Sequence, residues 1–231
     1  MAASLLEEAM SCDHKGRMIQ ALSLYERNAF VLMNKMKEGH GETKQQLQQI
    51  PKLIDRIDIL TKRIEEKFRP EKCLKKQIVN NDDIGIGYDH IFGPYLSSKI
   101  IEVIVEEPLL RHENHYRNLE EFLIMLINRC EKLKFVRIVT IHDVSANSTQ
   151  ESRLNKLKSD ILRSGLRMDI KYTMNDVISK IVFDNGHIFK LGLGLNFHKN
   201  DINEYGLIIP RGLSDSKCLS TCYEVWKCAD F

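Results

Sequence analysis

The sequence contains no apolar stretch long enough to cross a lipid bilayer. Its longest apolar run, Phe122 to Ile127, is far shorter than the roughly 20 residues that a membrane-spanning helix needs. The N-terminal residues do not predict a secretory signal, because Glu7 and Glu8 interrupt a short apolar segment. We therefore expect any contact with a membrane to be peripheral.

Cysteine is sparse, and the two signs of charge nearly cancel. The 231 residues include six cysteines, which lie far apart except near the C-terminus, so we expect free thiols in a reducing, cytosolic compartment. A formal net charge of +2 provides no chain-wide basic field of the kind that nucleic-acid-binding proteins often carry, and we expect no nucleic-acid partner. Hydrophobic residues at 43% and a length of 231 residues fit a soluble protein of one large or two small domains.

Apolar residues in the N-terminal third recur at helical intervals. The clearest signal runs from Met18 to Met36, with steps alternating between four and three residues, and a shorter helix precedes it. Pro51 requires that a third helix either begins near Ile50 or kinks there. The apolar face of this third helix comprises Ile50, Leu53, Ile57, Leu60 and Ile64. The pattern predicts an all-α three-helix bundle over residues 1–69.

This bundle resembles an MIT domain, the module that binds the C-terminal tails of ESCRT-III subunits. The resemblance covers roughly Ala3 to Phe68, and its strongest part is the segment L-I-D-R-I-D-I-L from Leu53 to Leu60. The family usually has Ala at the position of Ile57 and Glu at the position of Asp58. Further matching residues in the first two helices are Asp13, Gly16, Ala21, Leu24 and Tyr25.

The resemblance implies a binding face on the third helix. Leu53 and Leu60 are expected to point into the bundle, whereas Ile54 and Asp58 lie on a neighbouring stripe. By resemblance, Ile54, Asp55 and Asp58 contact an amphipathic helical ligand that carries basic residues. The alternative interpretation makes Ile54 a fourth core residue and the acids a solvated helix face.

A basic segment follows the bundle. Between Lys62 and Lys76 the sequence has seven basic and three acidic residues, and Pro70 marks a domain boundary. We interpret residues 70–84 as a basic linker. Its cations either attract anionic lipid or are only solvated side chains at the end of a helix, where they interact favourably with the helix dipole.

Residues 85–231 alternate between strand and helix patterns. A buried strand from Ile100 to Glu106 is stopped by Glu107-Pro108, a second strand runs from Phe135 to Ile141, and Asn185-Gly186 forms the turn of a hairpin. Helical spacing follows the first two strands, over residues 116–127 and 154–162. This order predicts an α/β domain with a mixed sheet that is covered by helices.

This part resembles the phospholipase-D-like domain that follows an MIT domain in a family of proteins of cytokinetic abscission. The match spans about Gly85 to Trp226. The resemblance implies a homodimer formed through this domain and binding to phosphoinositide-containing, anionic membrane. It also implies a peripheral location at the midbody and the late endosome. The matching segments are Gly87-Tyr88 with Leu96, Glu106 to His112, Phe183 to Gly186, and Lys190 to Leu195.

Phospholipase D chemistry requires the pattern H-x-K-x-x-x-x-D, in which the His attacks phosphorus and the Lys binds the phosphate oxygens. Alignment through Asp184 puts Val177 at the His position and Ser179 at the Lys position. None of the eight histidines has a Lys two residues later. We therefore predict a non-catalytic copy of the fold, with no catalytic residue and no cofactor. His112 with His115 is too weak a pattern to predict a metal site.

Cations in this domain are candidates for binding lipid head groups. They are Lys180, Lys190, His198, Lys199 and Arg211, with Arg111 and His112 at the end of the first strand. The leading hypothesis is an adaptor that joins ESCRT-III tails to anionic membrane. Two alternatives stay open: a phosphodiesterase with a relocated His, such as His112 or His187, and a scaffold that binds only protein.

Overall fold

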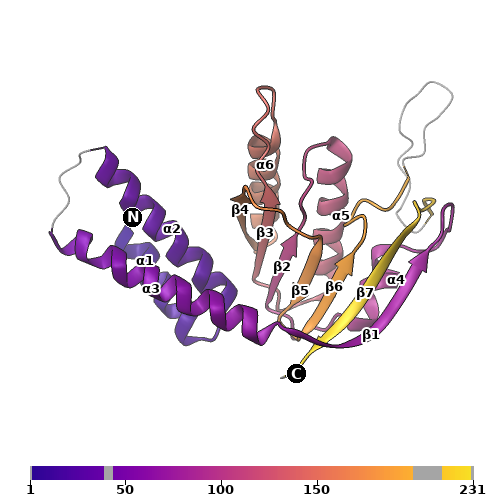
Figure 1. The fold of residues 1–231 in the computed structure, drawn as a ribbon, viewed down its shortest axis with the longest axis horizontal. Helices are drawn as coiled ribbons and strands as arrows, with labels where there is room; N and C mark the ends of the chain where they lie inside the picture. The colour runs from indigo at the N-terminus through magenta and orange to yellow at the C-terminus, as the bar shows by residue number, and fades with distance from the viewer. Residues whose placement is uncertain (1, 39–43, 200–214, 230–231) are drawn as a thin grey trace. The chain divides into compact units, whose positions relative to one another are not determined.

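The computed structural model describes residues 2–38, 44–199 and 215–229, and it divides the chain into two compact units (Figure 1). The first unit comprises residues 1–69 and is helical, whereas residues 70–231 are built on a single sheet. The predicted order, an all-α bundle followed by an α/β domain, is confirmed.

The described residues of the first unit form three helices, α1 (Ala2–His14), α2 (Met18–Lys37) and α3 (Lys44–Lys67). Gly16 ends the first helix with φ of +71°, a left-handed conformation that glycine adopts without steric cost. The apolar faces of the helices pack together, as their spacing predicts. The buried apolar residues are Ala9, Cys12, Ile19, Ala21, Leu22, Tyr25, Ala29, Leu32, Ile50, Leu53, Leu60, Ile64 and Phe68.

Pro51 lies inside α3. The helix begins at Lys44, so the prediction that it begins near Ile50 is wrong. Proline removes one backbone N–H from the helix ladder, which usually costs about 3 kcal/mol in a helix interior. The helix nevertheless continues on both sides, because apolar residues of α3, such as Ile50 and Leu53, are buried in the core of the bundle.

The second unit contains a mixed seven-stranded sheet within the described residues, with the strand order β1-β7-β6-β5-β2-β3-β4. Strands β2, β3 and β4 are parallel to one another, and the other neighbours are antiparallel. The strands are β1 (Pro70–Val79), β2 (Glu102–Glu106), β3 (Phe135–Ile141), β4 (Arg167–Thr173), β5 (Lys180–Phe183), β6 (His187–Leu191) and β7 (Thr221–Cys228).

Helices α4 (Tyr88–Phe92), α5 (Glu113–Arg129) and α6 (Gln150–Leu162) lie on one face of this sheet, and the 3-10 helix η1 (Gly93–Tyr95) follows α4 (Figure 1). Helices α5 and α6 are the crossovers between the parallel strands. The core between helices and sheet is aromatic at its centre, where the ring centroid of Phe92 lies 5.0 Å from that of Phe122 and 4.7 Å from that of Phe189. These aromatic contacts therefore hold the helices against the sheet.

Strand β1 overturns the predicted linker. Residues 70–79 do not connect the units as a free segment, because they pair antiparallel with β7 at one margin of the sheet. Ion pairing and burial join the two strands: Lys76 Nζ lies 2.7 Å from Glu224 Oε1, and Val79 is fully buried. Sequence reasoning missed both strands, since neither has a continuous apolar pattern.

Candidate functional site

Helix α3 presents an apolar residue between acids. Ile54 is 40% exposed, and Asp55 and Asp58 are also exposed, whereas Leu53 and Leu60 are buried. Ile54 is therefore not a fourth core residue, so that part of the alternative interpretation is wrong, whereas the exposure of Asp55 and Asp58 fits a solvated face as well as a binding face. Ile54 and Asp58 are four residues apart, so their side chains are neighbours on one face of the helix. The face offers an apolar contact beside negative charge.

A polar junction between α1 and α3 fixes the rotation of this helix. The guanidinium of Arg56 donates to both carboxylate oxygens of Asp13, at 2.7 and 2.6 Å, and the Tyr25 hydroxyl donates to Asp13 at 3.4 Å. Hydrogen bonding to Asp13 raises the pKa of Arg56, and burial, followed by the charge of Asp13, raises the pKa of Tyr25. Because Arg56 turns toward α1, its sequence neighbours Asp55 and Asp58 are left facing solvent.

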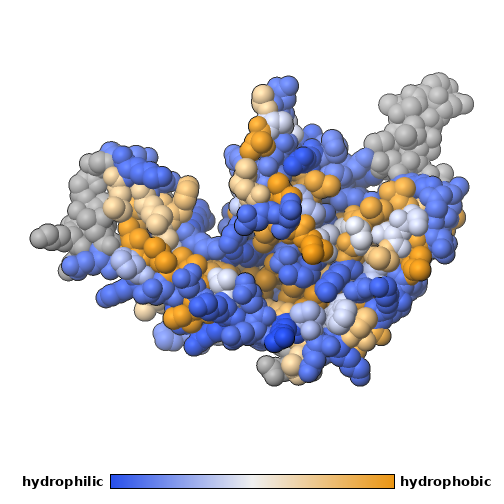
Figure 2. All heavy atoms as spheres, in the orientation of Figure 1, coloured by the Kyte–Doolittle hydropathy of each residue, from blue (hydrophilic) through white to orange (hydrophobic). Residues whose placement is uncertain are grey.

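Helix α2 adds exposed apolar surface that sequence reasoning did not single out. Phe30 is 64% exposed and Met33 is 41% exposed, and their spacing of three residues puts them on one side of the helix. Figure 2 shows apolar surface next to hydrophilic surface on the helices of this unit.

In the second unit, the positions that correspond to the phospholipase D motif have structural contacts. Val177 is half-buried just before β5, and Ser179 is buried. The carboxylate of Asp184 accepts hydrogen bonds from the backbone N–H groups of Ile101 and Glu102, both at 3.0 Å. Asp184 therefore fixes the start of β2 against the end of β5.

Glu107 occupies the space beside Ser179. Its side chain is buried, with 3% of the residue exposed, and one carboxylate oxygen accepts from Ser179 Oγ at 3.2 Å and from the backbone N–H of Leu195 at 2.9 Å. Burial raises the pKa of Glu107 from 4.5 to about 7. A Cβ atom at Gly194 would overlap the carboxylate, so this turn needs glycine. The Glu107-Pro108 stop signal gave no indication of this burial.

The predicted lipid-binding cations that the structure describes mostly interact with neighbours within the domain. Sheet register puts Lys180 opposite Lys190, and these two already have partners: Lys180 lies 3.0 Å from Glu106, and Lys190 Nζ lies 4.7 Å from the centre of the Trp226 ring. His198 is buried with its Nε2 atom 2.9 Å from Ile86 O, and burial lowers its pKa. Lys199 pairs with Asp82 at 2.9 Å.

Arg111 and His112 lie in the turn before α5. His112 caps this helix reciprocally with His115, whose Nδ1 atom accepts from the backbone N–H groups of Arg111 and His112 at 3.3 and 3.5 Å. These histidines therefore serve the helix end. Within the described part of the chain, no group of three or more His, Cys, Asp or Glu residues could hold a metal ion. Arg211 lies outside the described residues.

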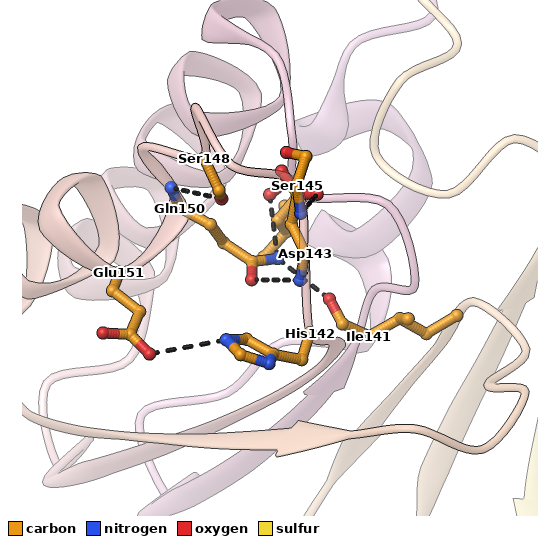
Figure 3. A network of polar contacts seen from close by, with 8 residues as sticks. Ile141, His142, Asp143, Ser145, Ser148, Gln150 and Glu151 are labelled. Carbon is orange, nitrogen blue, oxygen red and sulfur yellow. Dashed lines mark hydrogen bonds and ion pairs between the residues drawn. The ribbon is translucent and has the colours of Figure 1, made fainter.

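The loops at the carboxyl ends of the parallel strands meet at Gln150 (Figure 3). Its amide nitrogen donates to the carbonyls of Ile141 at 2.9 Å and Leu110 at 3.1 Å, and its amide oxygen accepts from Asp143 N–H at 2.9 Å. Nearby, His142 Nε2 lies 3.4 Å from Glu151 Oε1 (Figure 3). The buried amide of Gln150 thus joins the loops that follow β2 and β3. Its hydrogen bonds to the backbone fill the space at the carboxyl ends of these two strands, where a ligand could otherwise bind.

Among the described residues, no helix has both the length and the apolar character needed to cross a membrane. This finding agrees with the short apolar runs of the sequence.

Comparisons with known proteins found, among others, one curated relative and two solved structures that are similar to parts of this chain. The mouse protein named MIT domain-containing protein 1 is 25% identical over 209 residues, which are 89% of this chain and 84% of the mouse protein. Among solved structures, yeast tyrosyl-DNA phosphodiesterase and its H432R mutant are 14% and 11% identical, with TM-scores of 0.28 and 0.29. This chain spans 32% and 31% of those two structures, and the matches cover 65% of this chain.

A family model described as the phospholipase D-like domain at the C-terminus of MIT matches residues 85–227. That range begins after β1 and ends within β7, so it contains all the other strands of the sheet and the three helices that cover it. The chain therefore belongs to the family of proteins in which a phospholipase D-like domain follows an MIT domain.

Proposed function

We propose that this protein is a non-enzymatic adaptor. Its helical bundle binds the C-terminal tails of ESCRT-III subunits, and its phospholipase D-like domain binds anionic, phosphoinositide-containing membrane and pairs with a second copy. It acts in abscission during cytokinesis, as a peripheral protein on the cytoplasmic side of membranes at the midbody and the late endosome.

The observation that carries the proposal is the exposed face of α3. Ile54 stands between two exposed acids, and the Arg56–Asp13 ion pair keeps that face outward. An amphipathic helix with basic residues can bury an apolar side chain against Ile54 and place its cations near Asp55 and Asp58. Such a contact buries apolar surface at its centre and has charge at its rim, as specific interfaces do.

Replacement of one exposed residue tests this face. We expect Ile54→Asp to weaken binding to ESCRT-III tail peptides at least tenfold, because a charge replaces the central apolar contact. The measurement is a titration of the full chain with labelled peptides. Met10→Asp is the matched control, because Met10 is 47% exposed but belongs to helix α1 and not to α3. Equal affinity of Ile54→Asp and the parent chain would show that the tail binds elsewhere.

The non-enzymatic part of the proposal is supported by the surroundings of Ser179. Val177 has no nucleophilic atom, and Ser179, which donates to buried Glu107, supplies no cation that could bind a phosphate group. The relocated-histidine alternative is disfavoured, because His112 caps a helix and the Nδ1 atom of His187 lies 3.1 Å from Asn185 Oδ1. Hydrolysis of a phosphodiester by the purified chain, lost in His112→Ala or His187→Ala, would favour the enzyme instead.

Membrane binding and self-association are the remaining parts of the proposal. Two weak contacts in one molecule strengthen each other through effective concentration, which suits recruitment to a polymer that lies on a membrane. Flotation with phosphoinositide-containing vesicles tests the first part, and sedimentation of the full chain tests the second. The protein-only scaffold alternative predicts no difference between neutral and anionic vesicles.

A further inference from the structure

Three loops that are far apart in the sequence meet at one end of the strands, where β2, β3 and β4 begin. Strands β2, β3 and β4 are parallel, so the loops that precede them lie at the end opposite to their arrowheads (Figure 1). Backbone bonds connect the loops directly: Lys134 N–H donates to Ile101 O at 2.9 Å, and Arg167 N–H donates to Lys134 O at 3.0 Å. Residues some thirty positions apart in the sequence therefore lie side by side.

These loops are strongly basic. Residues 96–101, 130–134 and 163–167 contain five lysines and arginines and a single acid, Glu131. We call the five cations the basic edge, and all of them are exposed. They are Lys99, Lys132, Lys134, Arg163 and Arg167.

The lysines of the basic edge are available to a ligand. Lys99, Lys132 and Lys134 form no ion pair with any residue that the structure describes. Arg163 lies 3.7 Å from Asp160, yet its side chain remains 84% exposed. The carboxylate of Asp184 lies near this edge and accepts from the backbone N–H groups of Ile101 and Glu102.

The opposite end of the strands has the reverse character. Its described loops contain Arg111, Lys199 and Lys217 but a larger number of acids, and Lys199 and Lys217 both lie near Asp82. That end also exposes apolar residues, including Val144, at 72%, and Met174 and Ile178, both at 75%. The sheet is thus polarised along its strands, and positive charge is concentrated where the parallel strands begin.

We propose that the basic edge is the surface through which the phospholipase D-like domain docks on an anionic membrane. This inference rests on the membrane part of the proposed function and names its residues. A row of cations on adjacent strands fits a flat, negatively charged surface. Leu162, 57% exposed beside Arg163, offers an apolar side chain at the same level. The three loops contain no Trp, Tyr or Phe, which disfavours single-stranded nucleic acid as the ligand.

The basic edge differs from the cations that the sequence suggested. Lys180, Lys190 and Lys199 each interact with a neighbour within the domain, as an ion pair or a cation–π contact, so a membrane would have to compete for them. Unpaired lysines avoid that competition. Each cation close to an anionic surface increases the affinity for that surface about fivefold. Removal of three lysines should therefore lower the affinity for the membrane about 100-fold.

The test compares two triple variants of the full chain that have the same net charge. One is Lys99→Gln, Lys132→Gln and Lys134→Gln, and the matched control is Lys180→Gln, Lys190→Gln and Lys199→Gln. Each protein is floated with phosphatidylcholine vesicles that contain or lack phosphatidylinositol phosphate, over a series of salt concentrations. Thermal melting of each variant verifies that it is folded.

We expect the parent chain and the control to float with the phosphoinositide vesicles in low salt, and the edge variant to stay unbound. Equal flotation of the edge variant and the parent would overturn the assignment of the edge and leave membrane binding by another surface. Equal loss in both variants would also overturn it, because total charge would then govern binding. A parent chain that binds neither type of vesicle would instead remove the membrane part of the proposed function.

Discussion

At the scale of single residues, Glu107 is the most unusual group in the described part of the chain. It is buried at the end of β2, and its hydrogen-bond donors are neutral groups such as Ser179 Oγ–H and Leu195 N–H. Tyr88 of α4 faces it, and Arg117 and Glu121 of α5 lie near Tyr88. Without a paired cation, the charged carboxylate is disfavoured, which explains its raised pKa.

The raised pKa of Glu107 predicts how stability depends on pH. Its value is 4.5 when unfolded and about 7 when folded, so its protonated form favours the folded state. The contribution is fully present below about pH 4.5, falls as the pH rises, and is lost above about pH 7, with a total near 3 kcal/mol. We expect Glu107→Gln to flatten this part of the curve, measured by chemical denaturation of residues 70–231 at several pH values.

Glu106→Gln is the control for this experiment. Glu106 is the neighbour of Glu107 in the sequence, but its side chain is partly exposed and pairs with Lys180 at 3.0 Å. This variant should retain the pH dependence of the parent. If Glu107→Gln and the parent lose stability in parallel between about pH 4.5 and about pH 7, another buried group titrates in this range and the assignment to Glu107 is incorrect.

At the scale of secondary-structure elements, β1 decides where the second domain begins. It has exposed apolar residues, Leu74 at 42% and Ile78 at 68%, and its pattern of mixed charges looks like a linker. Its residues nevertheless pair with β7 from Pro70 to Val79, with Gln77 accepting from the Tyr223 hydroxyl at 2.7 Å. A sheet that lacks β1 would present β7 as an unpaired strand.

Two fragments test the role of β1. We expect residues 70–231 to form a stable domain and residues 85–231 to melt about 10 °C lower and to aggregate, because the backbone groups of β7 lose their partners. Thermal melting and gel filtration measure the two effects. The same melting temperature and elution for both fragments would mean that β1 is an attachment that the sheet does not need.

At the scale of the whole molecule, the chain combines two units with opposite local charge. The exposed face of α3 is acidic around Ile54, whereas the basic edge of the second unit is positive. In the proposed function, each surface binds a different ligand of the opposite sign. Neither contact has to be strong, because joining the two increases the apparent affinity without new contacts.

This arrangement predicts avidity. Vesicles that carry both an anchored ESCRT-III tail peptide and phosphatidylinositol phosphate should bind the full chain about a hundredfold more tightly than vesicles with either ligand alone. The measurement is flotation of the full chain beside the fragments 1–69 and 70–231. Purely additive binding of the two fragments and the full chain would contradict the adaptor arrangement.

The sequence alone determined the features that depend on local periodicity. Helical spacing predicted that Leu53 and Leu60 are buried, because 3.6 residues per turn fix which side chains share a face. The exposure of Ile54 did not follow from spacing alone, which also allowed a core position, and was favoured by the family resemblance. The bounds of β3, Phe135 to Ile141, followed from a segment of β-branched and apolar residues that only Arg137 interrupts. The two resemblances followed from motifs that are local in the sequence.

Only the tertiary structure decided what depends on contacts between distant segments. Strand β1 became a strand because β7, far along the chain, satisfies its backbone hydrogen bonds. Glu107 became a buried acid because the turn at Gly194 closes over it. The lysines that gather at one end of the strands, Lys99, Lys132 and Lys134, were not distinguishable by sequence from other surface lysines, because parallel pairing of β2, β3 and β4 is what brings their loops together.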